Sequence, residues 1–241
     1  MKRKIDISML SLQEIADWLL LQGTLNECPG LIYGKTGIAL FFFHYARYTS
    51  DKLFEEYAWD LLEQSQLQIH ANFRPDYEKG IAGIGVGIDY LIRHDFLDVT
   101  PELFDDLDER MYRAVMYEPC INYGLFDGWI GFGRYWIMRQ STSVAQECLE
   151  RITEQVTHPL RELSLEEWTD LQGYLLDLRI YLNWEVDKFP SQPPGTLVIS
   201  KKRSLVTNTL GLLFGYAGEG MTLLTAMGCI DSQWKRLIQS N

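Results

Sequence analysis

Residues 128–133 read Gly-Trp-Ile-Gly-Phe-Gly, and a similar spacing of glycines occurs before three other apolar stretches of this 241-residue chain. The related segments are Gly34-Lys-Thr-Gly37, Gly80-Ile-Ala-Gly83-Ile-Gly85 and Gly215-Tyr-Ala-Gly218-Glu-Gly220. Measured between the second glycines, the intervals are 46, 48 and 87 residues. A fixed period is typical of a repeat protein, and the last interval is close to two periods. The spacing therefore predicts a fifth, degenerate copy, with Gly173 as its mark.

Two helices fit into each period. An apolar run follows every glycine segment, and a more charged run separates it from the next segment. In the charged run 51–66, apolar residues recur on one helical face. Helix-start signals precede three charged runs, at Ser50 or Asp51, at Thr100 with Pro101, and at the capping box of Ser164 with Glu167. The pattern predicts about ten helices, paired as helical hairpins.

The alternation of apolar and charged helices predicts two layers. The apolar helices would form an inner ring packed on both sides, and the charged helices an outer ring facing water. We expect a single all-α domain over residues 1–241, an α/α toroid-like array of about five hairpins whose ring is either closed or open. The proline-rich stretch 186–200 interrupts the pattern, so the outer helix before the last repeat is expected to be short or replaced by a loop.

The motif glycines are expected to occur because of the backbone geometry of the turns, since glycine has a low helix propensity. Each one near a helix start costs roughly 1 kcal/mol relative to alanine, so packing or a site must compensate. Glycine allows a positive φ and a close approach of two backbones, both of which suit a tight turn between packed helices. The alternative is that exposed helix N-termini bind a ligand.

Composition narrows the range of partners. With 33 Asp and Glu against 22 Lys and Arg, the net charge is −11, which leaves no basic surface for a phosphate backbone. The longest apolar stretch, 38–43, is far shorter than the ~20 residues of a bilayer span. We therefore expect a cytoplasmic protein that binds neither nucleic acid nor membrane. The four cysteines lie far apart, which predicts neither disulfides nor a zinc knuckle.

Inner helices that open with Gly-x-x-Gly at this spacing resemble the lanthionine synthetase C-like family of α/α toroids. The segments that resemble it are GLIYGKTGIAL (30–40), KGIAGIGVGIDYLI (79–92), GLFDGWIGFGRYWI (124–137) and LLFGYAGEGMTLL (212–224). The resemblance implies bacterial peptide modification, in which a zinc ion held by two cysteines and a histidine activates a peptide thiol. It also implies seven inner helices where this chain has five, so the ring would be open or completed by a partner.

The family's zinc ligands precede the first glycine of an inner-helix motif, and this chain lacks them there. The pairs at those positions are Ile32-Tyr33, Glu78-Lys79, Phe126-Asp127 and Leu213-Phe214. Cys28 and Cys120 precede motifs by six and eight residues without a histidine, and His44 and His94 occupy non-equivalent positions. We therefore expect no metal, no cofactor and no zinc-dependent cyclase activity.

Three functions remain open at this point. The first is a non-zinc accessory protein that binds a peptide substrate or a partner biosynthetic protein, because the repeats are kept while the ligands are lost. The second is a carbohydrate-active hydrolase with paired carboxylates, for which Asp127 and Glu219 are the catalytic candidates and Glu78 a third. The third is a scaffold, or a subunit of a homo-oligomer.

A functional surface is expected where the glycine turns converge at one end of the inner ring. Helix N-termini, aromatic rings and charges from separate repeats would meet a ligand there. Glu219 stands out because two other copies have Ile84 and Phe132 at its position. A buried carboxylate needs water or a cation, such as Lys35 or Arg134. The predicted ligand-binding residues are Tyr33, Lys35, Tyr77, Glu78, Asp127, Trp129, Tyr216 and Glu219.

Overall fold

The computed structural model describes residues 10–98, 100–186, 190 and 210–239, and this part of the chain contains nine α-helices and no β-strand. The helices are α1 (Leu12–Gln22), α2 (Lys35–Thr49), α3 (Lys52–Gln66), α4 (Ile81–Arg93), α5 (Asp105–Tyr117), α6 (Trp129–Met138), α7 (Ala145–Thr157), α8 (Leu165–Leu182) and α9 (Tyr216–Ala226). Three 3₁₀ segments accompany them, η2 (Gly23–Leu25), η3 (Pro101–Phe104) and η4 (Gln233–Leu237). The all-α prediction is confirmed, while most of the proline-rich stretch 186–200 lies outside the described residues.

The helix starts follow two kinds of sequence signal. α2, α4, α6 and α9 each begin directly after the first glycine of a motif. Asp51 caps α3, and Ser164 forms the predicted capping box with Glu167 at the start of α8. The prediction at Thr100 and Pro101 is confirmed in part: Thr100 is the N-cap residue and Pro101 opens the first turn, but the Thr100 side chain makes no capping hydrogen bond and this turn is a 3₁₀ segment that leads into α5.

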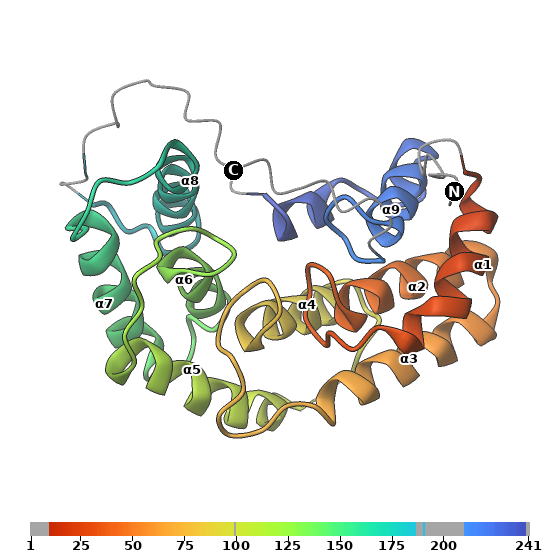
Figure 1. The fold of residues 1–241 in the computed structure, drawn as a ribbon, viewed down its shortest axis with the longest axis horizontal. Coiled ribbons are helices and arrows are strands. Elements are labelled where there is room, and N and C mark those ends of the chain that lie inside the picture. Colours follow the sequence, from red (N-terminus) through yellow and green to blue (C-terminus); the bar gives the residue numbers. More distant parts are fainter. Residues whose placement is uncertain (1–9, 99, 187–189, 191–209, 240–241) are drawn as a thin grey trace, which may run out of the picture.

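The helices form two curved layers (Figure 1). α3, α5 and α7 follow the outer, convex side, and α2, α4 and α6 lie inside them. Inner and outer helices of a hairpin pack together, α2 on α3 and α6 on α7. Phe41 and Phe42 of α2 and Trp136 of α6 have no exposed surface. Apolar inner and charged outer helices thus alternate as the sequence pattern predicts.

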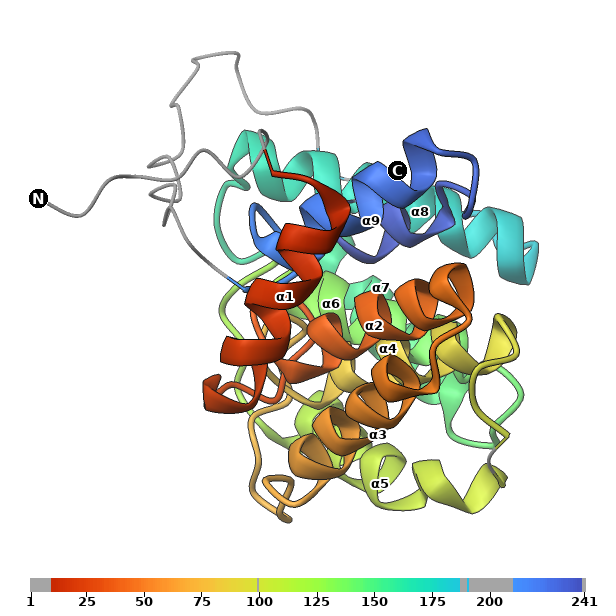
Figure 2. The ribbon, with the colours of Figure 1, turned by 90° about the vertical axis from the view of Figure 1, so that its right-hand side faces the viewer.

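The last inner helix lies beside the first. α9 packs on α1 and α2, whereas elsewhere α2 contacts α4, α4 contacts α6 and α6 contacts α8. The inner helices therefore follow one another in the order α9, α2, α4, α6, α8. Figure 2 shows the end of this array, where α1 lies on the side nearest the viewer. The C-terminal helix α9 therefore packs against the N-terminal helices α1 and α2.

The segment after α9 crosses the inside of the arc towards α8 (Figure 1). Arg134 of α6 donates hydrogen bonds to the backbone carbonyls of Arg236 and Gln239. The Arg236 guanidinium donates one to the Tyr181 hydroxyl of α8 at 2.7 Å, and η4 also contacts α4. Residues 233–239 therefore connect α4, α6 and α8 on the inner side of the arc.

Backbone hydrogen bonds join each glycine turn to the next around the arc. The Leu212 amide donates to the Ile32 carbonyl at 2.8 Å, and the Ile32 amide donates to the Glu78 carbonyl at 3.1 Å. The Glu78 amide in turn donates to the Phe126 carbonyl at 2.9 Å. The order of these turns is the order of the helices α9, α2, α4 and α6, so the repeat aligns the starts of its inner helices.

The motif glycines permit close backbone approach, not a positive φ. The first glycines have an extended backbone, with φ from −108° to −135°. A side chain on Gly83 would collide with the carbonyl oxygen of Tyr77, six residues earlier. The same collision would occur between Gly37 and Leu31, Gly131 and Leu125, and Gly218 and Leu212. The expectation of positive φ is therefore wrong at these helix starts, and the expectation of close approach is confirmed.

The packing register shows where α8 fits into the repeat. A side chain on Gly85 would meet the ring of Tyr135, which lies four residues after the second glycine of its own repeat. A side chain on Gly133 would likewise meet the ring of Tyr174. Counting back four residues from this ring reaches Asp170, which occupies the position of the second glycine.

α8 therefore corrects the prediction for the fifth copy. The helix itself is present where it was expected, but Gly173 is not the equivalent of the other second glycines. No glycine turn precedes α8, which begins with a capping box instead. The carboxylate of Asp170 accepts the hydrogen bond of the Leu125 amide at 2.8 Å, in place of a turn carbonyl.

Candidate functional site

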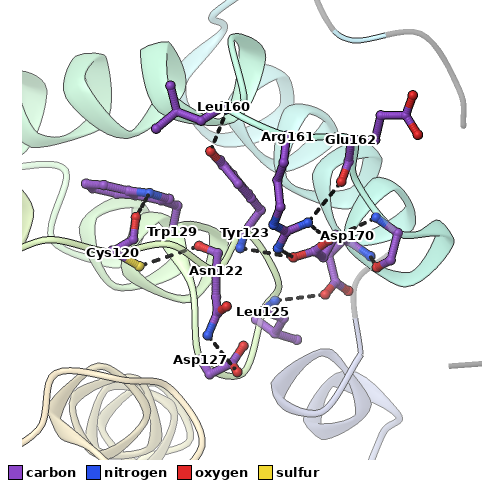
Figure 3. Close-up of polar contacts among 12 residues, drawn as sticks. Cys120, Asn122, Tyr123, Leu125, Asp127, Trp129, Leu160, Arg161, Glu162 and Asp170 are labelled. Atoms are coloured by element: carbon purple, nitrogen blue, oxygen red, sulfur yellow. Dashed lines mark hydrogen bonds and ion pairs between the residues drawn. The ribbon is translucent and has the colours of Figure 1, made fainter. Parts of the chain in front are cut away.

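The turn before α6 shows how a glycine turn is built (Figure 3). The Trp129 indole N–H donates to the Cys120 carbonyl at 3.1 Å. The Asn122 side-chain amide donates to the Asp127 carboxylate, also at 3.1 Å. Two of the predicted site residues of this turn are thus engaged within the turn itself.

The first amide groups of the inner helices are also hydrogen-bonded within their turns. Lys35 donates to the Cys28 carbonyl at 2.8 Å, Ile81 to that of Arg74 at 3.0 Å, and Trp129 to that of Asn122 at 3.1 Å. In each case the acceptor lies seven residues before the donor. The repeat therefore caps these helices with loop carbonyls, and these N–H groups are not open to a ligand.

The eight predicted ligand-binding residues differ in accessibility. Lys35, Tyr77, Trp129 and Tyr216 are buried, Tyr33, Glu78 and Glu219 are half-buried, and Asp127 is exposed. Tyr216 stacks on Trp18 of α1 with ring centroids 5.8 Å apart. The aromatic residues of the turns thus contribute to packing, and a ligand at the glycine turns stays a prediction.

The two candidate carboxylates do not lie on neighbouring elements. Glu219 is on α9 and Asp127 precedes α6, and α2 and α4 lie between these helices in the arc. Carboxylate pairs of glycosidases are about 5–9.5 Å apart, while adjacent packed helices are already about 8–10 Å apart. Arg134, one of the cations proposed for Glu219, lies instead 3.9 Å from Asp177.

Metal binding finds no support in the described residues, where no group of three or more His, Cys, Asp or Glu side chains could hold an ion. Burial raises the pKa of the Cys28 thiol and raises that of Cys120 to about 11. A thiol with a raised pKa stays protonated at neutral pH and is a poor nucleophile and a poor metal ligand. These two cysteines are therefore not activated.

A pocket of about 180 Å³ lies on the inner side of the arc. Its walls come mainly from the middle and the C-terminal parts of the inner helices, and Tyr77 of the turn before α4 also lines it. They include Val86 and Asp89 of α4, Arg134 and Ile137 of α6, and Asp177 and Tyr181 of α8. Gln233, Arg236 and Leu237 of η4 close another side. Of the eight predicted site residues, Tyr77 lines this pocket.

Three buried polar side chains, those of Tyr77, Arg134 and Asp177, line one part of this pocket, its floor. Among the described residues the Tyr77 hydroxyl meets no hydrogen-bond partner with standard geometry, although Arg134 lies near enough to interact with it. The side chains of Arg134 and Asp177 are each 9% exposed, and their nearest nitrogen and oxygen are 3.9 Å apart. Burial raises the pKa of Tyr77, an effect that the neighbouring Arg134 opposes. The floor of the pocket therefore combines a neutral phenol with a charge pair of zero net charge.

Several other polar residues of the pocket have partners of their own. Asp89 forms an ion pair with Arg93 at 2.7 Å, and burial raises the pKa of Asp89. The Tyr90 hydroxyl lies 2.9 Å from Nε2 of His44, and the His94 ring stacks on Tyr90. Burial lowers the pKa of His44 to about 3, so its imidazole is neutral.

Sequence reasoning missed this pocket because it looked to the glycine turns, whereas most of the lining residues lie further along the helices. Asp89, Arg134 and Asp177 lie on three helices that are far apart in the sequence, and only in α6 is the charged residue the single one of its helix. Charged residues are rarely buried unless they are paired, so a charge inside an apolar helix was the available signal. Arg134, the single charge of α6, was therefore the clearest indication of a polar site on the inner helices.

No helix in the described part of the chain has both the length and the apolar character needed to cross a bilayer. Comparison of the chain with models of known protein families, with curated proteins and with solved structures gives no match. A fold does not determine a function, whereas the residues and geometry of a site limit the chemistry it can support.

Proposed function

We propose that the chain is a lanthionine synthetase C-like protein without a zinc centre, which binds a peptide as an accessory component of modified-peptide biosynthesis in the cytoplasm. The Gly-x-x-Gly helix starts and the position of α9 beside α2 support the family assignment. This neighbourhood is typical of a ring in which the last hairpin meets the first. We therefore propose a shortened α/α toroid, in which residues 233–239 take the place of missing hairpins.

The polar pocket inside the arc is the observation that carries the binding proposal. A buried hydroxyl without a partner of standard geometry, such as that of Tyr77, is costly unless water or a ligand completes its hydrogen bonds. Ligand sites typically combine apolar walls with a few converging polar groups, and Val86 and Ile137 supply such walls here. Arg134 already binds backbone carbonyls of the C-terminal segment, which is a contact that a peptide backbone would also make.

A fluorescein-labelled library of hexapeptides, measured by fluorescence polarisation, tests this proposal. Val86→Phe would place a ring in the pocket and should weaken binding of the selected peptides at least tenfold. Leu67→Phe is the matched control, because Leu67 is exposed and does not line the pocket. A combined Glu219→Gln and Asp127→Asn variant probes the glycine turns and should leave the affinity unchanged.

The variants separate the rival sites and functions. Binding that survives Val86→Phe but is lost in the Glu219 and Asp127 variant would move the site to the glycine turns. A library in which no peptide binds the wild-type chain would overturn the proposal and leave the scaffold function. The hydrolase receives less support, because its candidate carboxylates lie on elements that are not neighbours.

A further inference from the structure

The floor of the pocket offers hydrogen-bond donors and acceptors side by side. The Tyr77 hydroxyl can donate one hydrogen bond and accept others, the Arg134 guanidinium only donates, and the ionised Asp177 carboxylate only accepts. These groups line one pocket, and the Tyr77 hydroxyl is buried without a partner of standard geometry among the described residues. A ligand group that satisfies this floor must therefore both accept and donate.

Charge selects against ionised ligand groups at the same place. A carboxylate at the floor would be attracted by Arg134 but repelled by Asp177, and an ammonium group the reverse, so neither gains a net attraction that offsets the loss of its hydration. Both side chains are 9% exposed, so these attractions and repulsions are weakly screened there. An apolar group would avoid this loss of hydration but would leave the Tyr77 hydroxyl unpaired.

We propose that this floor binds a neutral carboxamide, the side chain of a glutamine or asparagine residue in a bound peptide. Its carbonyl oxygen accepts a hydrogen bond from Tyr77, and its NH₂ group donates to Asp177, because a carboxamide carries an acceptor and a donor on neighbouring atoms. The volume of about 180 Å³ suits one side chain, since pockets for drug-sized ligands are roughly 300–1,000 Å³. This inference rests on the proposed peptide-binding function.

A series of pentapeptides Ala-Gly-Xaa-Gly-Ala tests the inference, with acetylated N-termini and methyl-ester C-termini so that Xaa carries the primary carboxamide. Xaa is Gln, Asn, Glu, Lys, Ser or Leu, and dissociation constants are measured by NMR titration of the full chain. Gln or Asn should bind about tenfold more tightly than Glu, Lys and Leu, because each of these three leaves a polar group unpaired or loses the hydration of its charge. Ser distinguishes a hydroxyl ligand from a carboxamide.

Tyr77→Phe removes the hydroxyl and keeps the ring. It should abolish the carboxamide preference, whereas Tyr174→Phe should retain it. Tyr174 is a matched control, because it is equally buried but its hydroxyl lies 3.2 Å from that of Thr153 and does not line the pocket. Thermal unfolding of both variants checks that each is folded.

The outcomes separate this inference from the function on which it rests. A carboxamide preference that disappears in Tyr77→Phe and persists in Tyr174→Phe supports it. Peptide binding that prefers Glu, Lys, Ser or Leu, or that shows no preference, overturns the carboxamide site and leaves peptide binding intact. Absence of binding by every peptide in the series and in the library overturns both.

Discussion

Replacing Gly83 by alanine sets two effects of opposite sign against each other. Gly83 lies in the first turn of α4, where helix propensity favours alanine by about 1 kcal/mol. A Cβ atom at this position would lie well inside the 3.0 Å below which such contacts essentially never occur, and the obstacle is the backbone carbonyl of Tyr77 rather than a flexible side chain. The carbonyl must therefore move outwards.

The structure indicates which hydrogen bonds that movement strains. The amides of Tyr77 and Glu78 both donate to the Phe126 carbonyl, at 3.1 and 2.9 Å, and so hold this turn to the next. Each is worth about 1 kcal/mol, and overpacking adds about 1–3 kcal/mol. After the gain in propensity is subtracted, we expect Gly83→Ala to lower the free energy of unfolding by about 2–4 kcal/mol.

Circular dichroism at 222 nm, followed during thermal and urea unfolding, measures this loss, which corresponds to a decrease in Tm of roughly 5–15 °C for a chain of this size. Gly124→Ala is the control, since the nearest atoms to its Cβ would be 3.4 Å away, and its stability should change little. A Gly83→Ala variant as stable as the wild-type chain would refute the argument that close backbone approach requires the glycine.

Three further predictions concern stability and metal content. The pKa of His44 is near 6.5 in the unfolded chain but about 3 in the folded chain, so the unfolded chain binds more protons between these pH values. The free energy of unfolding should therefore fall as the pH is lowered through this range, by up to ~1.4 kcal/mol per pH unit. Urea titrations should show a smaller dependence on pH for His44→Phe. Asp170→Ala leaves the buried Leu125 amide unpaired and should cost about 1–3 kcal/mol, whereas Asp170→Asn keeps an acceptor and should cost less; equal losses in urea midpoints would contradict this. Elemental analysis should find less than one zinc per chain, and a stoichiometric zinc that survives chelator would redirect attention to Cys28 and Cys120.

The repeat could be predicted from the sequence because a backbone carbonyl approaches the second glycine of each motif so closely that no residue with a side chain fits there. The spacing therefore persists and gives the positions of the inner helices. The register of α8 was predicted wrongly because Asp170 occupies the position of the second glycine, and its side chain accepts the hydrogen bond that a backbone carbonyl accepts elsewhere. Gly173 lies only three residues later, so its spacing from the other motifs fitted the period although it is not the equivalent glycine.

The site was harder to predict than the fold. Its polar floor is formed by Tyr77, Arg134 and Asp177, which come together only when the turn before α4 packs with α6 and α8. Tyr77 was identified because it precedes a motif, and Arg134 was considered only as a partner for Glu219, whereas Asp177 lies within α8 and belongs to no motif. The contribution of residues 233–239 depends on where the chain goes after α9, which periodicity alone does not specify.

The central claim, that a peptide binds in the pocket inside the arc, is tested most directly by ¹⁹F NMR of the chain labelled with 3-fluorotyrosine. Single Tyr→Phe variants assign the signals, and a selected hexapeptide is then titrated. Tyr77, Tyr90 and Tyr181 line the pocket, and Tyr33 and Tyr216 lie at the glycine turns. The account predicts shifts of the three pocket signals with the other two unchanged. Shifts at Tyr33 and Tyr216 while the pocket signals stay in place would contradict it.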